Sequence, residues 1–250
     1  MRVARLMKDV AKRWVRPAVI QYAEHDFVAT TRIGAVLAGN TLDLIQRYVF
    51  AFGGWEPNLS RYIADRLRPG DVFVDVGANT GYFSLLASPI VGPSGKVLAL
   101  EASPAIHGLL LDNLRRNRAD NVEALNVAVA DRPLDALLTP GLIQKVRLVK
   151  IDAEGAEWPV IRGMREALRR APDDLEVVVE LSPRTLGAQG TTAEEVLSVF
   201  AEARFHPYRL EADDAAGSDR EAADPRPRRL TTPISVETGL VLSRRDAAFL

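Results

Sequence analysis

Acidic side chains stand at the ends of four apolar segments of this sequence, at Asp75, Glu101, Asp152 and Glu180. Each segment has the continuous apolar character of a strand that is buried on both faces. A carboxylate can accept the proton of a reacting hydroxyl group, and it can also bind the hydroxyl or ammonium groups of a ligand. Parallel strands end at the same edge of a sheet, so we expect these acids to share one ligand site.

The segment DVFVDVGANTG, residues 71–81, joins the first of these strands to an expected helix through residues 82–86. Gly77 lets the backbone approach a ligand where a Cβ atom would intrude. Asn79 or Thr80 can cap the helix, and the free N–H groups at its start suit a polar or negative ligand group. The alternative is an ordinary strand-to-helix turn that binds nothing.

The spacing within this turn distinguishes two kinds of cofactor. A dinucleotide site has the pattern G-x-G-x-x-G, whereas here Ala78 and Asn79 follow Gly77 and the next glycine is Gly81. Asp75 would repel a pyrophosphate, but it could hold the ammonium of an amino-acid moiety directly or through water. S-adenosylmethionine carries such an ammonium, so a nicotinamide-dependent oxidoreductase is the less favoured interpretation.

The segment KVLALEAS, residues 96–103, is the second expected strand, and it places Glu101 twenty residues after Gly81. Doubly wound sheets place an acid at about this sequence separation to bind ribose hydroxyls. We therefore expect Glu101 to bind the ribose of the cofactor. The alternative is a solvated glutamate before a helix that is capped by Ser103 and has Pro104 in its first turn.

Four segments in order resemble the successive motifs of FkbM-type methyltransferases, which have the class I S-adenosylmethionine-dependent fold: DVFVDVGANTGYFSLLA, VLALEASP, NVEALNVAVAD and LVKIDAEGAEWPVIRGM. The resemblance covers roughly residues 55–180. It implies methyl transfer from S-adenosylmethionine, commonly to a hydroxyl group of a sugar or another small metabolite. We assign cofactor binding to Asp75, Gly77, Asn79, Gly81, Glu101, Ser103 and Asp131. Asp131 is a candidate acceptor for the adenine amino group, and its alternative role is that of a turn aspartate.

The segment KIDAEGAEW gathers three acids, Asp152, Glu154 and Glu157, at a strand end and helix start. A helix dipole stabilises acids there, so part of the cluster, Glu157 above all, could serve only to cap the helix. We assign catalysis to Asp152, Glu154 and Glu180, with a carboxylate as the base that takes the hydroxyl proton. Asp152 and Glu180 end neighbouring strands, as do the metal acids of catechol O-methyltransferase-like enzymes, so Mg²⁺ bound by these two is a further hypothesis.

Composition excludes several classes of protein. The 250 residues are 47% hydrophobic and 26% charged, as in an ordinary soluble protein, and we expect a cytoplasmic location. Lys and Arg total 32 against 33 Asp and Glu, so the global charge attracts no nucleic acid. The absence of cysteine excludes disulfides and thiolate metal sites. No apolar run approaches the roughly 20 residues that span a bilayer.

We expect an α/β, Rossmann-like chain with an N-terminal extension, residues 1–57, and a methyltransferase domain, residues 58–250. Residues 1–20 suit a basic amphipathic helix that either rests on an anionic membrane surface or packs on the domain. Residues 26–52 are expected to form short strands or helices over the cofactor end. A mostly parallel, seven-stranded sheet with helices on both faces is expected, with strands at 72–76, 97–101, 122–128, 147–152, 176–181, 207–211 and 239–243. The main expected helices are 58–67, 105–117, 157–170 and 193–203, and residues 213–229 are expected to form an exposed loop.

One departure from the family pattern follows Asp131, where a longer excursion is usual and this chain continues at once into RPLDALL. This departure leaves the identity of the methyl acceptor undetermined. The alternative function is that of a catalytically inactive binding protein with the same fold. Methylation of nucleic-acid bases is disfavoured, because the acids beside the expected crevice would repel a phosphate backbone.

Overall fold

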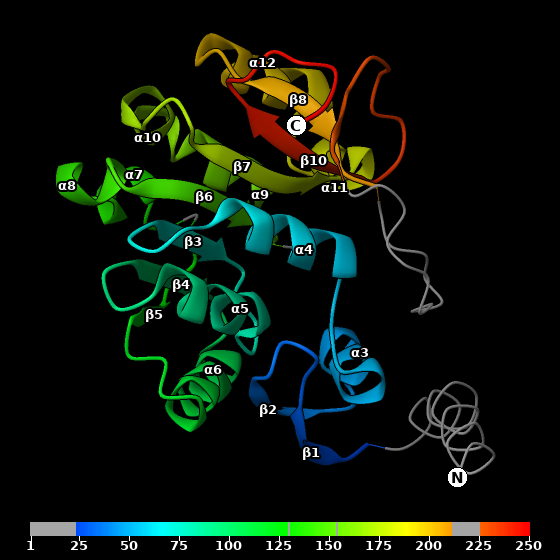
Figure 1. Cartoon of the computed structure of the whole chain (residues 1–250). Coiled ribbons are helices and arrows are strands. Elements are labelled where there is room, and N and C mark those ends of the chain that lie inside the picture. Colours follow the sequence, from blue (N-terminus) through cyan, green and yellow to red (C-terminus); the bar gives the residue numbers. More distant parts are fainter. Residues whose placement is uncertain (1–23, 130, 154, 212–225) are drawn as a thin grey trace, which may run out of the picture.

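The structure is a computed structural model that describes residues 24–129, 131–153, 155–211 and 226–250. The expected helix in residues 1–20, the acid Glu154 and most of the expected loop at 213–229 lie outside the described residues. Within the described part, the main sheet has eight strands in the order β5-β4-β3-β6-β7-β10-β8-β9 (Figure 1). Their bounds are β3 (Val72–Val76), β4 (Lys96–Glu101), β5 (Val122–Asn126), β6 (Val146–Ile151), β7 (Glu176–Leu181), β8 (His206–Arg209), β9 (Arg228–Arg229) and β10 (Thr238–Ser243).

The first five strands of this order run parallel to one another. β10 is antiparallel to both of its neighbours, β7 and β8. The chain passes from β3 outward through β4 to β5 and then returns to β6, so the strand order reverses between β3 and β6. The predicted mostly parallel α/β sheet is confirmed, and the ends of β3 and β6 flank the point where such sheets bind ligands.

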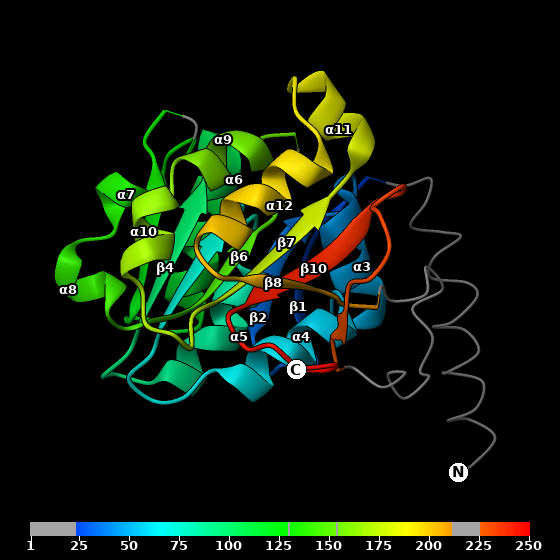
Figure 2. The same cartoon turned by 90° about the horizontal axis from the view of Figure 1, so that it is seen from above.

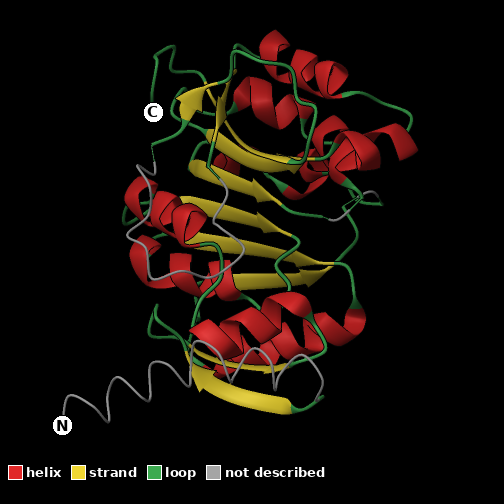
Figure 3. Ribbon diagram, turned by 90° about the vertical axis from the view of Figure 1, so that its right-hand side faces the viewer, coloured by secondary structure: helices red, strands yellow, loops and turns green. Residues whose placement is uncertain are grey.

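Helices cover both faces of the sheet, as Figures 2 and 3 show. Val72, Val74 and Val76 of β3 pack with α9 (Glu157–Arg162), α10 (Arg165–Arg170) and α12 (Ala193–Glu202). Phe73 faces the other way, toward α4 (Pro57–Arg66), α5 (Tyr82–Val91) and α6 (Pro104–Arg116). The remaining helices are α3 (Leu44–Phe52), α7 (Leu134–Leu137), α8 (Pro140–Ile143) and α11 (Pro183–Ala188). The alternation of a strand thus sends Asp75 to the α5 face.

Three boundaries differ from the sequence prediction. The helix expected at 157–170 is broken into α9 and α10, because Gly163 packs where a Cβ atom would lie 2.7 Å from Pro133, and because Asp135 accepts hydrogen bonds from the Glu166 and Ala167 N–H groups at the start of α10. β5 ends at Asn126, whose side chain turns back to donate to the Glu101 carbonyl. The expected loop at 213–229 ends in a short strand, β9, that pairs with β8.

The residues before the main sheet form a small unit of their own. β1 (Asp26–Thr30) and β2 (Val36–Asn40) make a two-stranded antiparallel sheet that α3 follows. Asn113 of α6 and Asn117, which follows the last residue of this helix, bind the backbone of β2. Their side-chain oxygens accept from the Ala38 and Val36 N–H groups, respectively. Residues 26–52 therefore do contain short strands and a helix, fixed to the face that α6 covers. Among the described residues, no helix is both long and apolar enough to cross a lipid bilayer.

Candidate functional site

The turn between β3 and α5 is held by contacts with the backbone of its neighbour strand. Gly77 has a φ of +74°, and a Cβ atom there would lie 1.8 Å from the Asp152 carbonyl oxygen. Glycine is therefore required at position 77 because the chain after β6 comes close to it. The sequence analysis had attributed this glycine to the close approach of a ligand. α5 begins after Gly81, which has a φ of +94° and makes no side-chain cap. Neither Asn79 nor Thr80 caps the helix, because the Asn79 side chain accepts instead from the N–H of Thr80.

Glu101 fastens this turn to the end of β4. Its Oε2 atom accepts a hydrogen bond of 2.9 Å from the Asn79 N–H, and its Oε1 atom accepts one of 2.9 Å from the Ser103 N–H. Ser103 caps α6 by accepting from the Ile106 N–H, with Pro104 in the first turn. The structure thus brings Asn79, Glu101 and Ser103 together, as the sequence predicted. Both oxygens of Glu101 accept hydrogen bonds from the backbone, so this residue also supports the local structure before α6.

Asp75 lies beneath this turn and is fully buried. Its Oδ2 atom accepts a hydrogen bond of 2.7 Å from the Ser84 hydroxyl of α5. Its Oδ1 atom lies 3.3 Å from the Lys150 Nζ atom but makes no hydrogen bond. Burial raises the pKa of Asp75, and the charge of Lys150 and the Ser84 hydroxyl offset this only in part. The carboxylate that was expected to face a ligand is turned into the protein.

Lys150, in the middle of the KIDAEG segment, was missed by the sequence analysis. Its Nζ atom lies 3.2 Å from Asp152 Oδ2 and 3.3 Å from Asp75 Oδ1, and it donates a hydrogen bond of 3.3 Å to the Gly77 carbonyl. The ammonium also lies 5.0 Å from the centre of the Phe83 ring. Burial by itself lowers the pKa of Lys150, but the carboxylates of Asp152 and Asp75 outweigh it and raise that pKa. Because β6 also contains Arg147, a charged residue in this strand was not a distinct signal that could have identified Lys150.

Glu56 is a second residue that the sequence analysis did not single out. It precedes α4 with a φ of 41° and a ψ of 73°, a left-handed conformation that is rare for a non-glycine residue. Its charge contributes to the raised pKa of Lys150, so the two groups are electrostatic neighbours. Strained backbone of this kind is concentrated at functional sites.

The predicted catalytic acids differ in their surroundings. Asp152 follows β6, and its side chain is 29% exposed beside Lys150. The parallel register pairs Ile151 with Val179, so the next residues, Asp152 and Glu180, lie level on neighbouring strands. Glu180 is exposed, whereas Glu157 is buried and accepts hydrogen bonds from the Gly155 N–H and the Gln189 amide. Glu157 therefore supports the start of α9, as the capping interpretation proposed.

Asp131 is exposed in a turn, where its N–H donates to the Ala128 carbonyl. Among the described residues, no hydrogen bond or ion pair joins Asp131 to the acids at the strand ends. The site that the described structure brings together is therefore the β3–α5 turn with Glu101, Lys150 and Asp152.

Comparison with known proteins shows a similarity in the second half of the chain. Residues 122–207 match the family model described as the methyltransferase FkbM domain. This match covers less than half of the chain, and it includes β6 and the KIDAEG segment.

One relative and two solved structures are also similar to this chain. An arsenite methyltransferase of Halobacterium salinarum is 33% identical over 163 residues, which are 59% of this chain and 40% of that protein. The chain thus spans less than half the length of this curated relative. A putative rRNA methylase of Clostridium thermocellum has a TM-score of 0.52 at 15% identity and covers 74% of this chain and 92% of its own. An S-adenosylmethionine-dependent O-methyltransferase of Thermotoga maritima has a TM-score of 0.51 at 17% identity and covers 92% and 83%. These two structures show that the chain has the Rossmann-like fold that methyltransferases also have.

The side chains of the candidate site do not fit Mg²⁺, which the sequence analysis had offered as a hypothesis for Asp152 and Glu180. The described residues hold no group of three or more His, Cys, Asp or Glu side chains that could bind a metal ion. The position beside the Asp152 carboxylate is taken by the Lys150 ammonium, and a cation would have to displace it. The metal assignment of these two acids is therefore not supported.

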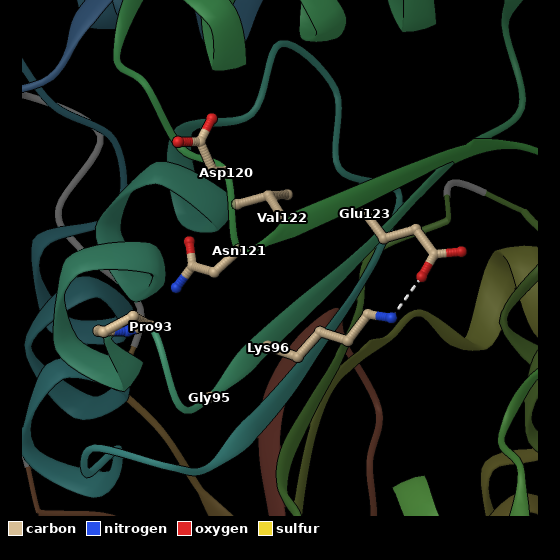
Figure 4. A pocket seen from close by; sticks show the side chains of 7 residues that line it. All are labelled: Pro93, Gly95, Lys96, Asp120, Asn121, Val122 and Glu123. Atoms are coloured by element: carbon tan, nitrogen blue, oxygen red, sulfur yellow. Dashed lines mark ion pairs between the residues drawn. The ribbon is translucent and has the colours of Figure 1, made fainter.

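A hollow of about 480 Å³ lies at the opposite edge of the sheet, where β4 and β5 begin (Figure 4). Lys96 and Glu123 in its lining form an ion pair of 2.5 Å. The Gly77 turn and the acids of the strand ends are all absent from its lining. This hollow is therefore separate from the candidate site, which lies at the other edge, where the parallel strands end.

Proposed function

We propose that this protein transfers the methyl group of S-adenosylmethionine to a hydroxyl group of a sugar or of a glycosylated small metabolite. The observation that carries this proposal is the partly exposed Asp152 carboxylate, held by Lys150 at the point where the strand order reverses. In doubly wound sheets this is the place for a ligand. The match of residues 122–207 to the FkbM family model supports the transfer of a methyl group, and the carboxylate supports a hydroxyl acceptor.

The cofactor is proposed to bind along the ends of β3 and β4. Glu101 would accept hydrogen bonds from ribose hydroxyls, because each of its oxygens uses one acceptor position on a backbone N–H and keeps another. Gly77, Asn79 and Gly81 would shape the turn that receives the rest of the cofactor, and Ser103 would support Glu101 from α6. Asp131 is proposed for the adenine side. Asp75 is proposed to act indirectly, through Lys150 and Ser84, since it is buried.

The described residues supply what the chemistry requires. S-adenosylmethionine, when bound, offers a sulfonium methyl group that an oxygen nucleophile can attack. The Asp152 carboxylate would accept the proton of the acceptor hydroxyl as the new bond between carbon and oxygen forms. Holding both reactants in attack geometry contributes on the order of 7 kcal/mol or more to catalysis of such a transfer. Glu180 and Glu154 are proposed to bind other hydroxyls of the acceptor.

The acceptor is proposed to be uncharged. Glu56, Asp152 and Glu180 would repel a phosphate or a carboxylate, while a sugar offers hydroxyl donors to the same oxygens. A nucleic-acid acceptor is disfavoured for the same reason. We do not extend arsenite methylation to this chain, because thiolates are the ligands that soft ions prefer and the 250 residues include no cysteine.

Titration calorimetry followed by an acceptor screen tests this function. We expect S-adenosylmethionine to bind and NADH not to bind. The screen would follow the release of S-adenosylhomocysteine with a panel of monosaccharides and glycosides. Glu101→Ala should weaken cofactor binding, while Asp152→Asn should keep the binding and lose turnover. Binding of NADH alone would contradict the proposal, and binding of S-adenosylmethionine without turnover on any hydroxylated acceptor would favour an inactive binding protein.

A further inference from the structure

Three oxygen atoms surround the Lys150 ammonium in the arrangement of a cation site. Asp152 Oδ2 lies at 3.2 Å from Nζ, and Asp75 Oδ1 and the Gly77 carbonyl oxygen lie at 3.3 Å. Two carboxylates and a backbone carbonyl are the kind of donors that bind Ca²⁺ and Mg²⁺ in proteins. In the described structure, however, the centre of this set is occupied by a lysine side chain.

The Asp75 carboxylate gives independent evidence that this set is built around a cation. It is fully buried, and its Oδ1 atom makes no hydrogen bond. A buried carboxylate oxygen without a hydrogen bond is costly, so the charge of Lys150 is what compensates it. Glu56, a strained residue at the start of α4, adds a third negative charge near Nζ.

We propose that the Lys150 ammonium is the built-in cation of this site, seated where a divalent ion would otherwise bind, so that the protein requires no metal ion. The claim that the reaction requires no metal ion rests on the proposed methyl transfer. The claim that Lys150 occupies the cation position does not depend on that function. Lys150 thereby acts as a positioning residue: it joins the end of β3 to the end of β6 and fixes the Asp152 carboxylate.

The placement of Lys150 explains why an external ion cannot compete with it. The side chain is 3% exposed and its ammonium lies over the Phe83 ring, so it is sequestered between α5 and β6. Because the ammonium is covalently attached to β6, its local concentration does not depend on the medium. A divalent ion would have to expel this group and shed its own water before it reached the same oxygens.

The experiment compares cation binding by the full chain and by three lysine variants. Thermal unfolding and titration calorimetry would be carried out with Mg²⁺ and with Ca²⁺, in the absence of any cofactor. The variants are Lys150→Ala, which empties the seat, and Lys150→Arg, which keeps a cation there. Lys96→Ala is the matched control, since it removes another ion-paired lysine from the same sheet, at the opposite edge.

Wild type, Lys150→Arg and Lys96→Ala are expected to show no cation-dependent rise in the unfolding midpoint. Lys150→Ala is expected to be stabilised by millimolar Ca²⁺ or Mg²⁺, because a ligand that binds only the folded state raises its stability. If this variant folds only when the ion is present, that result also supports the proposal. If it does not fold under either condition, Lys150→Gln replaces it, with the same expected gain of cation binding.

Two results would overturn the inference. One is a Mg²⁺-dependent rise in the unfolding midpoint of the wild type, or tighter binding of S-adenosylmethionine in Mg²⁺ than in a chelator. The other is a folded Lys150→Ala or Lys150→Gln protein that does not respond to either ion. Failure of the proposed function would appear separately, as an absence of S-adenosylmethionine binding in the wild type, whatever the response to cations.

Discussion

Two groups of charges lie at opposite ends of β6, and they differ in how many hydrogen bonds their buried carboxylate accepts. At the start of the strands, Glu176 Oε2 accepts hydrogen bonds from the Tyr62 hydroxyl at 2.7 Å and from Arg147 at 3.3 Å. Arg66 Nε lies 3.0 Å from the same oxygen, and Glu176 is 6% exposed. At the end of the strands, Asp75 Oδ1 has no hydrogen bond and Asp152 is 29% exposed.

This difference in bonding indicates that the Glu176 group stabilises the fold, whereas the group around Lys150 is suited to a ligand. Several polar partners converge on the Glu176 carboxylate and shield it from water, so its charges stabilise α4 against β6 and β7. The group around Lys150 leaves acceptor positions unused and opens to solvent at Asp152. Charges arranged to shift pKa values beside a crevice are typical of functional sites. The four tests below measure this contrast.

The largest effect on stability is expected at the start of the strands. Glu176→Ala leaves Arg66 and Arg147 without their buried counter-charge, so the free energy of unfolding should fall by about 3–5 kcal/mol. Urea unfolding would measure this loss. The affinity for S-adenosylmethionine of the folded variant should equal that of the wild type, and a loss below about 1 kcal/mol would contradict the structural role of Glu176.

A smaller and pH-dependent loss is expected for Lys150→Met, on the order of 3 kcal/mol at about pH 7. Burial already raises the pKa of Asp75, and removal of the ammonium would raise it further. Below the pKa of about 3.9 that Asp75 has in the unfolded chain, the carboxyl is protonated in both states and its burial carries no charge penalty. As the pH rises through the higher pKa of Asp75 in the folded protein, the folded state of the variant loses stability. The difference from wild type should therefore shrink toward about pH 4.

Unfolding curves of Lys150→Met at the two pH values would measure this dependence. The control is Lys150→Met combined with Asp75→Asn, which removes the buried charge and should show little change with pH. A loss in Lys150→Met that is equal at both pH values would show that Asp75 does not depend on the ammonium.

Asp152→Asn should change stability by less than about 1 kcal/mol, because the side chain is partly exposed and Lys150 keeps Asp75 as a partner. Turnover should nevertheless fall by about 10² to 10⁴, the usual contribution of a general base. Steady-state kinetics with an acceptor from the screen would measure kcat, with calorimetry as the check on cofactor binding. Unchanged kcat would remove Asp152 from the role of base.

The smallest effect is expected at the exposed hollow of Figure 4. Lys96 and Glu123 pair at 2.5 Å, but their side chains are 40% and 47% exposed. Solvent screens such a pair, so Lys96→Ala should change stability by no more than about 0.5 kcal/mol. Its cofactor binding should be that of the wild type. Weaker binding of S-adenosylmethionine would show that this edge takes part in the site.

The positions of the strands could be predicted from the sequence because the apolar runs are long and the turns between them carry glycine and proline. Gly77 and Gly81 were singled out from the sequence as cofactor-binding positions, and both have a positive φ in the structure. The tertiary contacts that require glycine at these positions were not predictable. Gly77 is required by the Asp152 carbonyl and Gly81 by Leu110 of α6, and these are contacts between segments distant in the sequence.

The site was predicted in part for the same reason. Asp75, Glu101 and Asp152 follow from the rule that ligands bind where parallel strands end, which needs no coordinates. Lys150 and Glu56 were missed, because a single lysine in a strand and a single glutamate before a helix have no pattern of their own. Each of the two becomes notable only through short distances to charged groups on other segments, which the fold brings together.

The sequence by itself determined the resemblance to FkbM-type methyltransferases, the parallel sheet and the edge at which the acids gather, because these depend on local apolar patterns and on the order of motifs along the chain. The tertiary structure alone decided which carboxylate is buried, which faces solvent, and that a lysine lies between them. The physical reason is that the partner of a charge is set by distances of a few ångströms across neighbouring strands, and no pattern along one strand encodes those distances.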